Sequence, residues 1–287
     1  MKNVYILLLT GWVICFAQYR SGAQEFKEHV SKEFTPSTSR SAVLAVYNIS
    51  GSVKVVGYSG NKVVFDVDKT ISAKTSEELE RGKKEFQLEF EQAGDTIEAY
   101  IAEPHDSRPN QDWNEYRPER RIRYRYNLEF TIKVPFSMNL CVSTVNNGNI
   151  NISDVTGILN ISNVNGSIKI DGAKGTTDAH TVNGDVTVTY ISIPPDASSY
   201  NTINGNLTVT YPSGFSADLE FKSLNGNFYT DFGEVETLPF KVVKSDEKND
   251  GGTTYKLDKN STFRFGKGGK LFKFETLNGN VYVKRQS

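Results

Sequence analysis

The sequence predicts an all-β chain folded as a right-handed parallel β-helix, or β-solenoid, with about eighteen to twenty-one residues per coil. Residues 147–191 divide into five consecutive nine-residue units, each with glycine at its second position. The positions two, four and seven after each glycine are apolar in fourteen of fifteen cases, which is typical of short strands with one buried face. Asparagine precedes glycine in alternate units, so the full repeat is two units long and holds two strands per coil.

This repeat predicts which residues lie above one another. Equivalent residues on successive coils are one strand spacing apart, about 4.8 Å. We therefore expect a column of aliphatic side chains at Ile150, Ile168 and Val186. We also expect a ladder of side-chain amides at the asparagines that precede glycine: Asn147, Asn165, Asn183, Asn204, Asn225 and Asn278. An antiparallel Greek-key sandwich stays as the alternative, because strand periodicity does not report strand direction.

The first residues are typical of an export signal. Lys2 precedes an apolar run from Val4 to Ala17, and small residues follow. We predict a signal peptide over 1–23, cleaved after Ala23, with Ala17 as the second choice. The run is too short for a membrane span, so we expect no transmembrane segment after cleavage. The expected location is the periplasm, the cell surface or the extracellular space.

Removal of the signal peptide changes the net charge and the number of cysteines of the mature chain. The formal net charge is −1, and removal of Lys2 and Arg20 makes it −3, which excludes a nucleic-acid partner and a polybasic membrane patch. Without Cys15, Cys141 is the one cysteine left, so no intrachain disulfide can form. We expect Cys141 to be buried, because apolar residues flank it.

The remaining chain is predicted to be a flexible lead-in over 24–40 and a single β-solenoid domain over 41–287. Its N-terminal part, 41–135, holds strands and one short helix from Thr75 to Phe86, with acidic residues first and basic residues last. We expect this helix to cap one end of the stack, since exposed strand edges need cover.

The second part, 136–287, holds the Asn-Gly coils. Its later coils are longer than the central ones, because Gly184, Gly205 and Gly226 follow one another at a wider spacing than Gly148, Gly166 and Gly184. A hairpin is predicted around 249–252, where the sequence reads Asn-Asp-Gly-Gly. The rung that follows Gly279 is expected to close the stack.

These Asn-Gly rungs, the tyrosine-rich strand that ends at Val134-Pro135 and the tail RFGKGGKLFKFETLNGNVYVK resemble the bacterial putative-adhesin family of exported β-helix proteins, a domain of unknown function. The resemblance covers roughly 41–285. It implies a parallel β-helix and export to the cell envelope. It supplies no catalytic residue.

Signatures of catalysis and metal binding are not found. Calcium-binding β-rolls need an aspartate where Ile150 stands. The sequence contains no G-x-S-x-G, no H-E-x-x-H and no nucleotide-binding loop. His29, His105 and His180 occur in unrelated contexts. We therefore predict no catalytic, cofactor-binding or metal-ligating residue, no cofactor and no enzymatic activity.

One segment is rich in residues that bind partners well. Aromatic and arginine side chains are favoured at contact surfaces, and five of them make the predicted binding surface: Trp113, Tyr116, Arg117, Arg120 and Arg121. The strand that follows is a candidate to extend this surface, because it alternates arginine and tyrosine at Arg123, Tyr124, Arg125 and Tyr126. The alternative is that its two arginines face solvent while its two tyrosines face the core.

Together these features predict a non-catalytic exported cell-envelope protein, an adhesin or a binding or scaffolding module whose partner is a surface glycan or protein. A polysaccharide-active β-helix enzyme, a lyase or hydrolase, is the first alternative. An envelope-stress regulatory accessory protein is the second.

Overall fold

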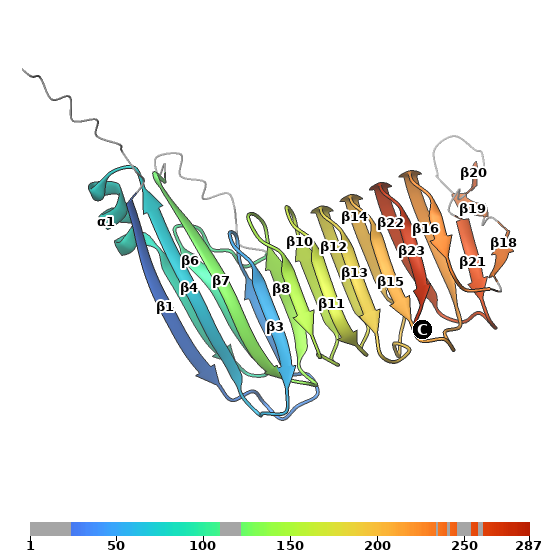
Figure 1. Cartoon of the computed structure of the whole chain (residues 1–287), viewed down its shortest axis with the longest axis horizontal. Helices are drawn as coiled ribbons and strands as arrows, with labels where there is room; N and C mark the ends of the chain where they lie inside the picture. The colour runs from blue at the N-terminus through green and yellow to red at the C-terminus, as the bar shows by residue number, and fades with distance from the viewer. Residues whose placement is uncertain (1–23, 110–121, 234, 240–241, 246–253, 258–260) are drawn as a thin grey trace, which may run out of the picture.

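Alternating apolar residues build two β-sheets that face each other across one hydrophobic core, as the computed structural model of the chain shows (Figure 1). The structure describes residues 24–109, 122–233, 235–239, 242–245, 254–257 and 261–287. The predicted signal peptide, 1–23, lies outside the described residues. The molecule is elongated in the direction in which the strands succeed one another (Figure 1).

The first sheet has ten strands. In spatial order they are β1 (Gln24–Phe34), β4 (Val63–Ala73), β7 (Tyr124–Pro135), β3 (Val53–Tyr58), β9 (Ile150–Ser153), β11 (Ile168–Ala173), β13 (Val186–Tyr190), β15 (Leu207–Tyr211), β23 (Val281–Arg285) and β17 (Phe228–Thr230). Neighbours from β7 to β17 pair in parallel. Strands β1, β4 and β7 pair antiparallel.

The second sheet has eleven strands. In spatial order they are β18 (Val235–Leu238), β21 (Ser261–Phe265), β16 (Ala217–Asn225), β22 (Leu271–Asn278), β14 (Ser199–Asn204), β12 (Thr177–Asn183), β10 (Leu159–Asn163), β8 (Asn139–Thr144), β2 (Val43–Tyr47), β6 (Thr96–Glu103) and β5 (Gln87–Ala93). Neighbours from β16 to β6 pair in parallel. Strand β5 at one end and strands β18 and β21 at the other pair antiparallel.

The predicted hairpin near the C-terminus is confirmed by a third, small sheet. Strand β19 (Val242–Ser245) pairs antiparallel with β20 (Thr254–Leu257). Residues 249–252 of its predicted turn lie outside the described part of the chain.

The all-β class is right, but the prediction of a right-handed parallel β-helix is wrong. Both sheets are mixed, with antiparallel strands at their ends. The strand order also departs from the chain order: β22 lies between β14 and β16, and β23 lies between β15 and β17. A β-helix adds each coil next to the one before it, and here the last two strands are inserted between earlier ones. A purely antiparallel sandwich is excluded by the parallel centre.

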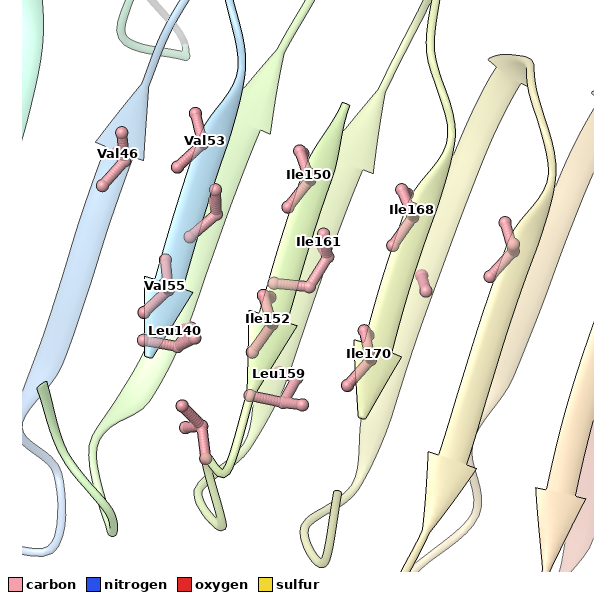
Figure 2. Close-up of a cluster of buried hydrophobic side chains, with 14 of the residues drawn as sticks. Val46, Val53, Val55, Leu140, Ile150, Ile152, Leu159, Ile161, Ile168 and Ile170 are labelled. Carbon is pink, nitrogen blue, oxygen red and sulfur yellow. The ribbon is translucent and has the colours of Figure 1, made fainter. Parts of the chain in front are cut away.

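The predicted aliphatic column is confirmed. Ile168 on β11 aligns with Ile150 on β9 and with Val186 on β13, and all three are 1% exposed or less. Figure 2 shows Val53, Ile150 and Ile168 on successive strands of one sheet, with Leu159 and Ile161 of the other sheet directed into the same space. The stacked strands thus share one continuous core.

Glycine is required where successive turns touch. A Cβ on Gly166 would lie 2.0 Å from the carbonyl oxygen of Gly148, a distance that no side-chain carbon tolerates. The carbonyls of these turns are satisfied by buried polar side chains that the alternation did not predict. Thr144 donates to Gly51 at 2.9 Å, and four others repeat the contact one rung apart: Asn163, Thr181, Thr202 and Thr276. Pairing removes the cost of burying these groups.

The predicted helix is confirmed as α1 (Ser76–Glu85). Thr75 is its N-cap, and the Thr75 hydroxyl accepts a hydrogen bond from the N–H of Glu78 at 3.2 Å. The buried side of the helix, at Leu79 and Gly82, packs on β4, β1 and β7. The prediction of a flexible lead-in over 24–40 is wrong for its first part. Residues 24–34 form strand β1, which pairs along its whole length with β4.

Candidate binding groove on the outer face of the second sheet

Two rows of polar side chains cross the outer face of β8, β10 and β12. The parallel register aligns Cys141, Asn160 and Asp178 in one row. It aligns Ser143, Ser162 and His180 in the next, two residues further along each strand. Successive residues of a row are about 4.8 Å apart, because that is the strand spacing. The alternation that buries Leu159 and Ile161 on the inner face puts these side chains outside.

A wall stands beside these rows, made by Tyr47 of β2 and by residues 107–109. Ser107 fixes this segment: its N–H donates to the carbonyl of Ile101 at 3.0 Å, and its hydroxyl accepts from the N–H of Ile101 at 2.8 Å. The same hydroxyl donates to the carbonyl of Tyr47 at 2.7 Å. The wall and rows enclose a groove of about 370 Å³.

Charge at the wall centres on Arg108, which pairs with Asp106 and lies 4.0 Å from a carboxylate oxygen of Glu91. Arg108 donates to both carboxylate oxygens of Asp106, at 3.1 Å to Oδ1 and at 2.6 Å to Oδ2. Its guanidinium lies 3.9 Å from the ring centre of Tyr100. Burial acts to raise the pKa of Asp106, but the hydrogen bonds from Arg108 outweigh it and hold that pKa below its usual value. Asp106 in turn raises the pKa of Arg108, so both groups stay charged and bound to each other.

Tyr47 is a neutral phenol at physiological pH. Burial, and next the neighbouring Cys141 thiol at 3.8 Å from the phenol oxygen, raise the pKa of Tyr47. Cys141 was expected to be buried, but it is half-buried and lines the groove. The groove therefore offers mostly uncharged hydrogen-bonding groups, with Asp178 as the carboxylate among its lining residues.

The register does not bring a nucleophile to a base. Cys141 and His180 lie on β8 and β12, two strands apart, which is about 10 Å between backbones. A nucleophile and its base must lie within hydrogen-bond distance. A glycosidase needs two carboxyl groups about 5–9.5 Å apart, and Asp178 has no second carboxylate beside it in this lining.

The binding surface predicted from sequence, Trp113, Tyr116, Arg117, Arg120 and Arg121, lies outside the described residues. In the strand that follows, the core interpretation is confirmed: Arg123 and Arg125 are exposed, Tyr124 is buried and Tyr126 packs on Phe86 with ring centres 4.6 Å apart. Sequence reasoning missed the groove, although His180 and Ser162 were recognisable as outward positions of the repeat.

The side-chain amides of the Asn-Gly turns form one hydrogen-bonded ladder along an edge of the second sheet. Each Nδ2 donates to the Oδ1 of the next asparagine at 2.7–2.8 Å, in the order Asn225, Asn278, Asn204, Asn183, Asn165, Asn146. Asn147 is not in this ladder, contrary to expectation. Its φ is +59°, and its amide donates to the hydroxyl of Ser50 at 3.1 Å.

Within the part of the chain that the structure describes, no cluster of three or more His, Cys, Asp or Glu side chains suits a metal ion. Among the same residues, no helix has the length and apolar character needed to span a membrane.

Comparisons with known proteins find solved structures with low sequence identity and low TM-scores. No family model and no curated protein matches the sequence. A putative cell adhesion protein from Clostridium sporogenes is 12% identical with a TM-score of 0.44, covering 91% of this chain and 100% of that one. A putative adhesin from Bacteroides fragilis is 10% identical with a TM-score of 0.35, covering 90% and 97%. A putative lipid binding protein from Parabacteroides distasonis is 10% identical with a TM-score of 0.28, covering 90% and 97%.

Proposed function

We propose that the protein is a non-catalytic, exported binding module of the cell envelope, which holds a short stretch of surface glycan in the groove over β8, β10 and β12. The leader-like first residues support export. The observation that carries the proposal is the double row of hydrogen-bonding side chains beside the wall of Tyr47 and residues 107–109.

The size and chemistry of the groove favour a sugar over a protein surface. Its volume of about 370 Å³ suits a small ligand, whereas a stable protein interface needs about 800 Å² on each partner. Sugar hydroxyls both donate and accept hydrogen bonds, as do the hydroxyls of Ser143, Ser162 and Tyr47 and the amide of Asn160. The apolar part of the Tyr47 ring adds a surface on which a sugar ring packs.

The alternatives have less support. A polysaccharide hydrolase needs two carboxyl groups about 5–9.5 Å apart, and Asp178 is the one carboxylate among the residues that line the groove. An envelope-stress accessory protein needs a protein partner, and the groove is small for one.

A glycan array probed with the purified protein tests the proposal, followed by calorimetric titration of the glycan that binds. Asn160→Ala should weaken binding about ten-fold, because it removes hydrogen bonds worth about 1.5 kcal/mol. The matched control is Asn151→Ala on the outer face of the first sheet, which should bind like wild type. An array without a hit, or an equal loss in the two variants, contradicts the proposal.

A further inference from the structure

Strand β1 is the outermost strand of the ten-stranded sheet, and no strand lies beyond it in the described part of the chain (Figure 1). Strand β4 pairs with it along its full length, so one side of its backbone is paired and the other is open. Such an edge is a template for another strand unless the protein protects it.

The sequence of β1 is complementary to itself in reverse. Residues 26–34 read FKEHVSKEF. When this segment is laid antiparallel on a second copy with Val30 opposite Val30, the pairs are Phe26 with Phe34, Lys27 with Glu33, Glu28 with Lys32, and His29 with Ser31. Every lysine and glutamate then faces the opposite charge, and the apolar residues face each other. Directly opposed pairs of this kind stabilise antiparallel strands.

The pairing with β4 fixes which way these side chains point. Phe26, Val30 and Phe34 are opposite the buried residues Ile71, Val67 and Val63, and they pack half-buried against the core at this end of the two sheets. The two-fold axis of this pairing passes between the two opposed Val30 residues, perpendicular to the sheet. It therefore keeps the core-facing side of both copies on the same side of the joined sheet. Phe26 of one copy then packs on Phe34 of the other, which covers apolar surface that the single chain leaves partly exposed.

Contacts within the chain explain only some of the charges on β1. Glu28 pairs with Lys69, Glu33 with Lys62 at 2.6 Å, and His29 with Asp68 at 2.8 Å, all on β4 or the turn before it. Within β1, Lys27 lies 3.6 Å from Glu25. Lys32 differs, since its neighbour in the register is Phe65. Lysine on an edge strand also discourages indiscriminate pairing, but that role does not require the signs to alternate in a two-fold pattern.

We propose that two copies of the chain associate through antiparallel β1 strands centred on Val30, which joins their ten-stranded sheets into one continuous sheet. The contact is isologous and closes with two copies. It leaves the groove free, because the groove lies on the other sheet. The outer faces of both second sheets then turn to the same side, so the dimer presents two grooves to one surface. This last consequence rests on the proposed function, and it adds avidity; the dimer itself does not depend on glycan binding.

Charge exchange between two variants tests the register, with mass measured by light scattering after size exclusion. In the proposed register, position 28 of each copy faces position 32 of the other. Lys32→Glu therefore places two glutamates opposite each other at both symmetric sites, and Glu28→Lys places two lysines opposite each other at the same sites. Each variant alone should dimerise roughly ten-fold more weakly than wild type or worse. An equimolar mixture should dimerise like wild type, because each chain then faces the opposite charge. Lys54→Glu, on the outer face of β3, carries the same charge change and should stay dimeric.

A cysteine scan gives a second readout that does not depend on charge. Directly opposed antiparallel residues have Cα atoms about 4.5–5.5 Å apart, within reach of a disulfide. Val30→Cys should therefore form a covalent dimer under mild oxidation. Ser31→Cys should not, because the two copies of residue 31 would be about 8 Å apart. A monomeric wild-type protein, a mixture that stays monomeric, or equal cross-linking at both positions overturns the proposal, and none of these results bears on glycan binding.

Discussion

A single side chain in this core contacts mainly the rungs on either side of it, and Ile170 shows the consequence. It is fully buried and aligned with Ile152 and Val188 on the adjacent parallel strands. Ile170→Asp puts an unpaired carboxylate into that column, and we expect it to unfold the protein. Asn165→Ala removes exposed amide hydrogen bonds and should cost about 1 kcal/mol. Urea unfolding measures both; midpoints equal to wild type in both variants would refute the register.

Three buried phenols make the stability sensitive to alkaline pH. The hydroxyl of Tyr200 lies 2.8 Å from that of Tyr190 and 3.1 Å from that of Tyr211, and all three side chains are fully buried. Burial raises the pKa of each tyrosine above its usual 10.0. The folded state therefore holds these protons more tightly than the unfolded state. Their contribution to stability is complete below about pH 10 and is lost as the pH rises through the folded-state values.

Tyr200→Phe tests this coupling. Wild type should lose up to about 1.4 kcal/mol per pH unit for each tyrosine above pH 10. The variant should be less stable at neutral pH by about 1–2 kcal/mol, because Tyr190 and Tyr211 lose a partner, yet its stability should fall less steeply with pH. Urea midpoints between about pH 9 and 11 give both slopes. Tyr229→Phe, at a 47% exposed position, is the control and should keep the wild-type slope; equal slopes for wild type and Tyr200→Phe would exclude the coupling.

At the scale of elements, α1 begins and ends where the local sequence predicts a helix. Thr75 caps it, Glu77 and Glu78 stand in its first turn, and Lys83 and Lys84 in its last. Thr75→Ala removes the cap and should lower the free energy of unfolding by about 1 kcal/mol. Ser76→Ala, at the first helical residue, should be neutral or stabilising because alanine favours helix. Thermal melts of the two variants decide, and an equal loss in both would show that the cap contributes nothing.

Among the strands, the sequence predicts some positions in the sheets and not others. Alternation identified the inner face of β9, β11 and β13, because their glycines, Gly148, Gly166 and Gly184, recur at one constant interval. It could not place β23 relative to β17, since Gly226 and Gly279 both follow an asparagine and each precedes one of these strands. The groove was out of reach for a similar reason: Tyr47 arrives there because β2 lies between β6 and β8. Such neighbours are chosen by the packing of the whole chain.

At the scale of the molecule, segments from both halves of the chain are held between strands from elsewhere in the sequence. Strand β3 lies between β7 and β9, and β23 lies between β15 and β17. Contacts between residues far apart in sequence dominate this fold, and such topologies fold slowly because the long loops must close first. The C-terminal rung in particular can be completed only after β14, β15, β16 and β17 are available to receive it.

Removal of residues 271–287 tests this order of strands directly. Without β22 and β23, β17 loses its parallel partner and β16 keeps its antiparallel partner β21 alone. Hydrogen exchange at the amides of β17, and at the β16 amides that face β22, should accelerate toward unprotected rates, while β9, β11 and β13 stay protected. A synthetic peptide of residues 271–287 should restore protection. The same peptide with Gly279→Ala should not, because the added Cβ would lie 1.8 Å from the carbonyl oxygen of Gly205. Full protection of those same β16 amides in the truncated chain would mean that β16 pairs directly with β14, as the spacing of Gly205 and Gly226 alone predicts.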